Sequence, residues 1–298
     1  MAAPSGTAPF GRVLVAMVTP FTAAGDVDLD GAQRLAAHLV DAGCDGLVVS
    51  GTTGEAPTTT DQEKDRLLHA VVEAVGDRAH VLAGVGTNDT AHSIELARAA
   101  EKAQAGGLLV VTPYYSKPPQ EGLLAHFRTV ADATALPLML YDIPGRTGTP
   151  IRTETLVRLA DEERIVAVKD AKDDLGETSR LLASTDLAVY SGTDMLNLPL
   201  LAIGGTGCVS VIGHLFAREL VAMHDAFAAG DVAGAAALHR RLVPACVGFF
   251  RTQGVITTKA ALAMLGLPAG PVRPPLVDAT DAERAALRDD LAAAGLAL

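Results

Sequence analysis

A lysine that directly follows an apolar run has the side chain most suited to covalent chemistry in this chain. Residues 165–168 are β-branched or small, as in a strand of a parallel sheet that is buried on both faces, and Lys169 comes next. Burial disfavours the charged form of an ammonium group, and the neutral amine is a nucleophile that can form a Schiff base with a ketone. A lone lysine at a strand end more often extends its charge into water, so Lys169 needs partners before catalysis is favoured.

Candidate partners for this lysine follow other apolar runs of the chain. The hydroxyl of Tyr141 can relay a proton, and the guanidinium of Arg146 has the geometry to bind a carboxylate. The run Gly51-Thr-Thr-Gly54 offers the hydroxyls of Thr52 and Thr53, together with backbone N–H groups, to a second carboxylate. These groups are suited to binding a carboxylate-bearing substrate beside the lysine.

Each partner also has a purely structural interpretation. The run Gly51-Thr-Thr-Gly54 can simply turn a strand into a helix, with its threonines as caps. Arg146 can be a surface residue after a Pro-Gly turn. The tyrosines favour a site, because three of the four in the chain lie at or shortly after the end of an apolar run; these are Tyr114, Tyr115 and Tyr141.

Eight short apolar runs determine where these residues lie. Each is followed by a turn with Gly, Thr or Pro and then by a helix-length segment, which is the pattern of a βα unit. The runs are 13–17, 46–50, 80–84, 108–111, 137–141, 165–169, 187–191 and 207–211. They predict an α/β fold, a (β/α)8 TIM barrel over residues 10–230, with its active site at the C-terminal ends of the strands. A dinucleotide-binding fold is disfavoured, because Val18-Thr-Pro-Phe and not a glycine-rich loop follows the first run.

Helices are predicted between the runs and in the remainder of the chain. Within the barrel, amphipathic segments predict helices over 29–42, 61–75 and 90–105. Residues 231–298 have no further apolar runs of the strand type, and helices are predicted there over 231–242, 244–250, 259–265 and 281–294. We interpret 231–298 as a small helical appendage beside the barrel and not as a second catalytic domain.

The composition excludes several classes of protein. The 298 residues carry a formal net charge of −11, which disfavours nucleic acid as a partner. The longest apolar runs, such as 196–203, are too short for a membrane span. Residues 1–9 lack the cationic and apolar regions of a signal and are interpreted as a loose N-terminus. The three cysteines are far apart, which fits reduced thiols in the cytoplasm. The scattered histidines disfavour a zinc site, and a serine-hydrolase motif is absent.

Five motifs, in order and at matching spacing, resemble those of the dihydrodipicolinate synthase family. This family belongs to the N-acetylneuraminate lyase superfamily of class I aldolases, and the resemblance covers about residues 13 to 265. The motifs are Gly51-Thr-Thr-Gly-Glu55, Val111-Thr-Pro-Tyr-Tyr115, Tyr141-Asp-Ile-Pro-Gly-Arg-Thr-Gly148, Val168-Lys-Asp170 and Ser191-Gly192. Single motifs of this kind are weakly specific, whereas five in register at the ends of the predicted strands are strongly so.

The resemblance implies a proton relay beside a covalent lysine. Lys169 would form the Schiff base with pyruvate, and no separate cofactor or metal would be needed. Tyr141 would pass protons in a triad with Thr53 and Tyr115. In the family the second tyrosine of the Tyr-Tyr pair reaches into the neighbouring subunit's site, so Tyr115 implies at least a dimer, and a dimer of dimers is expected.

The resemblance also implies how the two substrates are bound. Thr52 and Thr53 would hold the pyruvate carboxylate, and Arg146 would bind the carboxylate of L-aspartate 4-semialdehyde. The main chain of Gly192 and Val209 would line the pocket near the lysine. The expected activity is that of a lyase-type synthase in the diaminopimelate and lysine pathway, in the cytoplasm.

Two other functions are compatible with parts of this pattern. A related aldolase, lyase or dehydratase acting on a sugar-derived 2-keto acid would share Lys169 and Tyr141 but would not require Arg146. A barrel that only binds a ligand would need no proton relay, so the presence of Thr53 and Tyr115 disfavours it.

The sequence departs from the family pattern at three places. The strand-seven motif reads Ser-Gly-Thr-Asp194, and His214 stands where many members carry Asn. Members that lysine inhibits bind it at the dimer interface through polar residues. The corresponding residues here are Ala56, Pro57, Asp61, Lys64, Asn88, His92 and Tyr114. Because the Lys64 ammonium would repel that of the effector, weak or absent inhibition by lysine is expected.

Overall fold

Eight parallel strands form a closed barrel in the computed structural model, which describes residues 8–297. Each strand pairs with its neighbour in the chain, and β8 pairs with β1. The strands are β1 Val13–Ala16, β2 Gly46–Val49, β3 His80–Gly84, β4 Gly107–Val111, β5 Leu138–Asp142, β6 Ile165–Asp170, β7 Ala188–Ser191 and β8 Gly207–Ser210. The predicted (β/α)8 barrel is confirmed, and every strand lies within about one residue of its predicted bounds.

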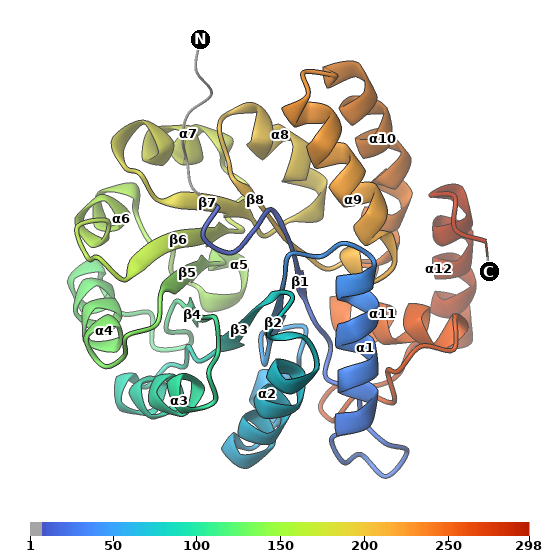
Figure 1. Cartoon of the computed structure of the whole chain (residues 1–298), viewed down its shortest axis with the longest axis horizontal. Coiled ribbons are helices and arrows are strands. Elements are labelled where there is room, and N and C mark those ends of the chain that lie inside the picture. The colour runs from blue at the N-terminus through green and yellow to red at the C-terminus, as the bar shows by residue number, and fades with distance from the viewer. Residues whose placement is uncertain (1–7, 298) are drawn as a thin grey trace.

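Helices surround the barrel (Figure 1). They are α1 Leu29–Asp41, α2 Asp61–Val75, α3 Thr90–Lys102, α4 Gln120–Asp132, α5 Pro144–Thr147, α6 Thr153–Leu159, α7 Leu175–Ser184, α8 Asn197–Ala202 and α9 Gly213–Ala228. Short polar residues begin several of them. Asp28 accepts a hydrogen bond from the Gly31 amide at the start of α1, and Thr60 and Glu63 form a reciprocal capping box at the start of α2.

The barrel interior is filled by side chains and is not a channel. Its inward-facing members, from alternate positions of the strands, are Leu14, Ala16, Val48, Leu82, Leu109, Met139, Tyr141, Ala167, Ala188, Tyr190 and Val209, with Phe10 beneath them. The Tyr190 hydroxyl donates a hydrogen bond to the Gly11 carbonyl at 2.9 Å, which closes the N-terminal end of the barrel. The opposite, C-terminal end is therefore the one that is open to a substrate.

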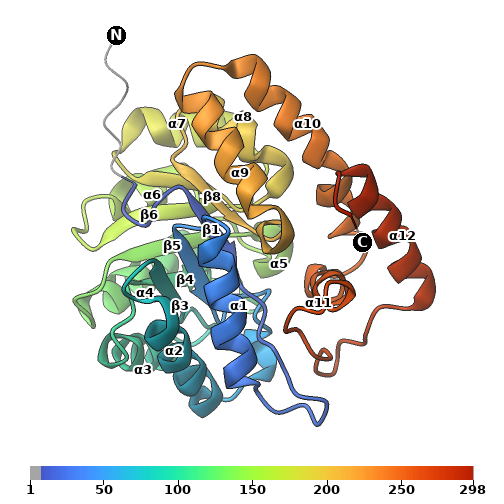
Figure 2. The same ribbon diagram turned by 45° about the vertical axis from the view of Figure 1, so that its right-hand side comes forward.

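Three more helices, α10 Val232–Gly248, α11 Gly254–Met264 and α12 Asp281–Ala293, follow the barrel. Helix α10 packs on α9 and α12 packs on α10, so that these helices lie outside the ring beside α1 and α9 (Figure 2). The predicted separation of two helices at Pro244 is wrong, because α10 continues through it. The proline removes only one backbone N–H donor, and Leu242, Ala245 and Cys246 bury the same helix face on either side of it.

Residues 1–7, most of the stretch interpreted as a loose N-terminus, lie outside the described part of the chain. Within residues 8–297, the helices are all too short or too polar to cross a membrane.

Candidate active site

Lys169 and Tyr141 face each other inside the barrel at its C-terminal end. They are partners in the register of β6 and β5, and both side chains point inward. The Lys169 Nζ atom lies 4.2 Å from the centre of the Tyr141 ring. Lys169 is only 4% exposed, because its side chain points into the barrel and its stem is surrounded by apolar residues. A buried amine beside a phenol is suited to form an imine and to exchange protons during that reaction.

Gly192 leaves room for the lysine. A Cβ atom at this position would lie 3.2 Å from Lys169 Cε and 2.9 Å from the Ala171 Cβ atom. The Gly192 amide donates to the Asp170 carbonyl at 2.7 Å, which holds the backbone after β7 against the end of β6. Val209 of β8 is fully buried among the inward-facing side chains of the barrel. Any side chain at residue 192 would therefore press on the stem of the lysine.

The Gly51-Thr-Thr-Gly-Glu55 loop follows β2 at the same end of the barrel. Thr53 is buried, and Thr52 is partly exposed and lines the cavity described below. The loop backbone is held close to the strands, since Thr19 Oγ1 donates to the Gly54 carbonyl at 2.6 Å. Glu55 ends the loop with a φ of 55°, in the left-handed region.

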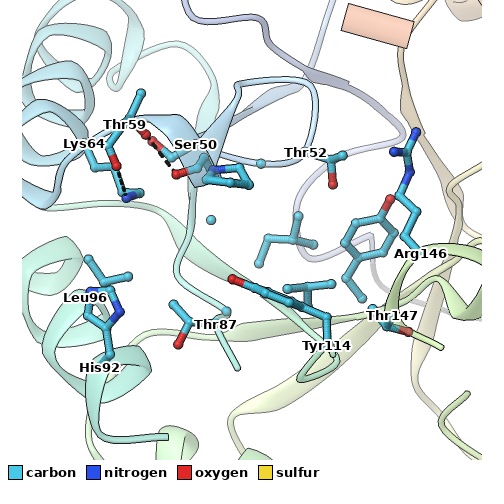
Figure 3. A pocket seen from close by; sticks show the side chains of 18 of the residues that line it. Ser50, Thr52, Thr59, Lys64, Thr87, His92, Leu96, Tyr114, Arg146 and Thr147 are labelled. Atoms are coloured by element: carbon cyan, nitrogen blue, oxygen red, sulfur yellow. Dashed lines mark hydrogen bonds between the residues drawn. The ribbon is translucent and has the colours of Figure 1, made fainter. Parts of the chain in front are cut away.

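A cavity of about 650 Å³ opens at this end of the barrel. Thr52 and Arg146 lie together at one end of it, Lys64 and His92 at the other, and Tyr114 between the two groups (Figure 3). Tyr141 and Tyr115 also line the cavity. Thr53, Lys169, Gly192 and Val209 do not belong to its lining, and Lys169 is connected to it through the Tyr141 ring.

Arg146 is presented by the single-turn helix α5. The turn begins at Pro144 and ends at Gly148, whose φ of 75° is the left-handed conformation that suits glycine at a helix C-terminus. Thr147 Oγ1 donates to the Ile143 carbonyl at 3.1 Å and stabilises the turn. Arg146 itself is exposed to the cavity, and its guanidinium forms no salt bridge to any residue between 8 and 297. It is thus a cation available to an anionic ligand.

A buried charge cluster lies behind the ends of β5 and β6. The Lys172 ammonium sits 3.4 Å from Asp142 Oδ2 and 3.6 Å from Asp170 Oδ2. Asp142 Oδ1 accepts from the Ile151 amide at 3.1 Å and so ties the segment after α5 to the barrel. Burial raises the pKa of the Asp142 carboxyl to about 6. Lys172, which follows β6, and Asp142, the last residue of β5, were not singled out from the sequence.

Tyr115 has a strained backbone and an exposed ring. Its φ is 72°, which costs an L-residue other than glycine about 1 kcal/mol, and its surface is 89% exposed. This arrangement motivates the expectation that Tyr115 acts in a subunit contact.

The other end of the cavity holds a set of paired polar groups. His92 Nε2 and Asp61 Oδ2 are 2.8 Å apart. The Lys64 ammonium donates to the Thr59 carbonyl at 2.6 Å and lies 3.4 Å from Asp61 Oδ1. This end therefore presents a lysine whose charge is only partly balanced by one carboxylate.

Comparisons with known proteins agree with this geometry. The model of the dihydrodipicolinate synthetase family matches residues 9–294. The chain belongs to that family. A 4-hydroxy-tetrahydrodipicolinate synthase of Acidothermus cellulolyticus is 71% identical over 288 residues, 97% of this chain and 94% of that protein. One of Streptomyces coelicolor, named as number 2, is 67% identical over 99% of this chain and 100% of that protein. The crystal structure of dihydrodipicolinate synthase from Cyanidioschyzon merolae with lysine bound superposes with a TM-score of 0.96, at 43% identity, and covers 98% of this chain and 100% of that chain.

Membership of the dihydrodipicolinate synthetase family makes this chain an enzyme of the class I aldolase type. Enzymes of the family carry pyruvate as a Schiff base on a lysine and use no external cofactor. The family expectation drawn from the five motifs is confirmed. The buried contacts of Glu55, at the end of the Gly51–Glu55 loop, with Lys259 and Arg273 were missed in the sequence. The available signal was Lys259, the one charged residue of helix α11.

Proposed function

We propose that this chain is a 4-hydroxy-tetrahydrodipicolinate synthase that condenses pyruvate with L-aspartate 4-semialdehyde in the diaminopimelate and lysine pathway. The observation that carries the proposal is the buried Lys169 ammonium 4.2 Å from the Tyr141 ring, in a barrel of this family. The Lys169 amine adds to the pyruvate carbonyl, and loss of water gives the imine. Loss of a methyl proton then gives an enamine whose carbon attacks the aldehyde of the second substrate.

We assign the proton transfers to hydroxyl groups around the imine. Tyr141, with Thr53 and Tyr115, passes the protons, and Tyr141 lies against the lysine. The burial of Thr53 and the position of Tyr141 beside the amine support this assignment. Tyr115, exposed within one chain, completes the relay in a neighbouring subunit, so the enzyme acts as a homo-oligomer, a dimer of dimers.

We assign the two substrate carboxylates to two separate groups of residues. Thr52, which lines the cavity, and the buried Thr53, with the loop backbone, hold that of pyruvate. The main chain of Gly192 and Val209 lies deeper in the barrel, on the side of the lysine. Arg146 binds that of aspartate semialdehyde. Its lack of an ion pair with the described residues supports this assignment, because a free guanidinium in a cavity is suited to an anionic substrate. In this proposal residues 10–230 are the catalytic barrel, 231–298 are the helical appendage, and the enzyme works in the cytoplasm.

Reductive trapping tests the covalent step. The protein is incubated with pyruvate and borohydride, and the adduct is located by peptide mass spectrometry. We expect the adduct on Lys169, its loss in Lys169→Ala, and its retention in Lys64→Ala, a control that removes another cavity ammonium. Absence of a pyruvate adduct on the unmodified protein would leave only a binding barrel.

A comparison of substrates tests the second partner. Turnover of pyruvate with aspartate semialdehyde is compared with cleavage of N-acetylneuraminate and of 2-keto-3-deoxygluconate, under identical conditions. We expect activity with aspartate semialdehyde alone. Preference for either sugar acid would replace the synthase by the related lyase activity, with the Lys169 chemistry unchanged.

A further inference from the structure

Glu55 is a buried carboxylate in a strained position at the end of the candidate pyruvate loop. Only 3% of the residue is exposed, and its φ of 55° is unfavourable for an L-residue other than glycine. Its amide donates to the Thr52 carbonyl at 3.2 Å, so the conformation of Glu55 is coupled directly to Thr52. A residue held in such a conformation requires surrounding contacts that fix it there.

Those contacts come from the C-terminal part of the chain. The Lys259 ammonium, on α11, lies 2.6 Å from Glu55 Oε1, and the Arg273 amide donates to Glu55 Oε2 at 2.8 Å. Lys259 is itself 3% exposed and donates to the Pro271 carbonyl at 2.8 Å. Both oxygens of the carboxylate are thus engaged by residues that follow the barrel.

Arg273 extends this contact to the residues that follow the loop. Its guanidinium donates to the Thr58 carbonyl at 2.7 Å and to Glu63 Oε2 at 3.0 Å. It also lies 4.3 Å from the centre of the Phe21 ring, and the Lys259 ammonium lies 4.0 Å from the same ring. The segment from Glu55 to Glu63 is therefore fastened from one side, while Thr52 faces the cavity on the other.

We propose that Glu55 and Lys259 are positioning residues, which hold the Thr52-Thr53 loop in the geometry that receives the pyruvate carboxylate. The inference rests on the proposed function of that loop. The helical appendage then acts on the substrate site indirectly. Its Lys259 holds Glu55 through a buried ion pair and does not contact substrate. A purely structural ion pair would change stability alone, whereas a positioning pair changes the Michaelis constant for pyruvate in the folded enzyme.

The first measurement separates the two substrates. Glu55→Gln and Lys259→Met are expected to raise KM for pyruvate about tenfold, which corresponds to about 1.4 kcal/mol, and to leave KM for aspartate semialdehyde within about twofold. The double variant Glu55→Gln/Lys259→Met removes both charges. It is expected to be no worse for pyruvate than either single variant, since the two residues act as one unit.

The matched control removes an ion pair elsewhere in the appendage. Arg251 pairs with Asp290 of α12, Arg251 Nη2 to Asp290 Oδ1 at 2.8 Å, with no contact to the loop. Arg251→Gln is expected to lower the melting temperature and to leave both Michaelis constants unchanged. The inference is overturned if Glu55→Gln and Lys259→Met behave like this control.

Removal of one charge can prevent folding, because an unpaired buried charge is strongly destabilising. Two conservative substitutions, which keep the charge, therefore complete the test. Glu55→Asp keeps the carboxylate but shortens its reach, and is expected to raise KM for pyruvate while the protein remains folded. Lys259→Arg, which retains the charge, is expected to restore most of the affinity lost in Lys259→Met. A normal KM for pyruvate in folded Glu55→Asp would contradict the inference.

Reductive trapping distinguishes this inference from the proposed function. The pyruvate concentration that gives half-maximal adduct is measured in the unmodified protein and in the Glu55 variants. Higher half-maximal concentrations in the variants are expected. Trapping at equal concentrations would refute the positioning role and leave the synthase proposal intact, whereas no adduct on the unmodified protein would refute both.

Discussion

Lys169 and Tyr141 face each other because their strands are paired in register and both side chains point inward. The alternation of a strand fixes which face a residue occupies, so a shift of one residue in either strand would move one partner out of the barrel. The distance of 4.2 Å between amine and ring centre therefore follows from the register of β5 and β6. Rigid strands position both groups, whereas a loop holds Thr52 and Thr53 and the single-turn helix α5 holds Arg146.

Replacement of Tyr141 by Phe tests the relay. We expect a fall in kcat of about 100-fold or more, because the hydroxyl that exchanges protons is lost while the ring still packs against Lys169. Steady-state kinetics and circular dichroism provide the measurement. The control is Tyr190→Phe in the same barrel, whose hydroxyl bonds the Gly11 carbonyl; it should cost about 1 kcal/mol of stability and leave kcat unchanged. Equal kcat values for the two variants would exclude Tyr141 from the relay.

Mixing of inactive subunits tests whether Tyr115 acts across a subunit interface. Tyr115→Phe and Lys169→Ala are each expected to have very low activity. After subunit exchange, a mixed dimer should hold one site with an intact Lys169 and an intact Tyr115 from the partner, so activity should return. Sedimentation of the unmodified protein checks the oligomer. If mixing restored nothing while the subunits demonstrably exchanged, Tyr115 would act within its own chain or not at all.

Replacement of Arg146 tests the second carboxylate. Arg146→Ala should raise KM for aspartate semialdehyde by at least about tenfold, because a charge-assisted hydrogen bond worth about 1.5–3 kcal/mol is lost. The KM for pyruvate should change little. Arg152→Ala removes a nearby exposed arginine outside the cavity lining and should change neither constant. A pyruvate-specific defect in Arg146→Ala would show that the two carboxylate sites have been assigned in the wrong order.

Inhibition by lysine should be weak or absent. The Lys64 ammonium, bonded to the Thr59 carbonyl and facing the cavity, repels a second ammonium close by. Initial rates at increasing lysine, with both substrates near their Michaelis constants, give the measurement. Lys64→Ala should become more sensitive than the unmodified enzyme. A micromolar inhibition constant for the unmodified enzyme would contradict this prediction.

His214 should make the protein less stable in mild acid. The Val18 amide donates to its Nε2 at 3.1 Å, and its Nδ1 lies 2.8 Å from the Val211 carbonyl, so the ring is bonded as the neutral tautomer. Burial lowers the pKa of His214 to about 4. The unfolded chain takes up the proton at a pKa of about 6.5, so the free energy of unfolding falls as pH decreases from about 6.5 to about 4.

Replacement of His214 by Asn removes this titration, and the amide keeps one hydrogen-bond donor group and one acceptor. Between about pH 7 and about pH 5, the variant should lose about 2 kcal/mol less stability than the unmodified protein, as measured by urea unfolding. A slope remains, because burial also lowers the pKa values of His126 and His224 to about 4. Identical losses in the two proteins would mean that His214 does not titrate in this range.

The parts of the fold that could be predicted from the sequence are those determined by local patterns. An apolar run followed by a glycine or threonine turn identifies a buried strand, and Thr60 with Glu63 identifies the start of a helix, so these bounds were predicted closely. Lys169 and Arg146 were recognised for the same reason, since each follows a run or turn of its own.

Contacts between distant segments could not be predicted in this way. Nothing near Glu55 indicates that Lys259 is its partner, and no local pattern states that α10 continues through Pro244. In both cases the decisive free energy comes from burial against other elements, namely an ion pair closed by tertiary packing and a helix face covered by its neighbours. The Asp142 and Lys172 pair depends likewise on two adjacent strands.

The Glu55 contact also orders events during synthesis. It joins Glu55 to Arg273, 218 residues later, whereas β8 is complete at Ser210. A chain still attached to the ribosome can thus have translated the whole barrel while its Thr52-Thr53 loop remains unfastened. The loop would be able to receive pyruvate only after the segment with Lys259 and Arg273 has left the ribosome. A truncated chain without that segment would contain Lys169 but would lack an ordered binding loop for pyruvate.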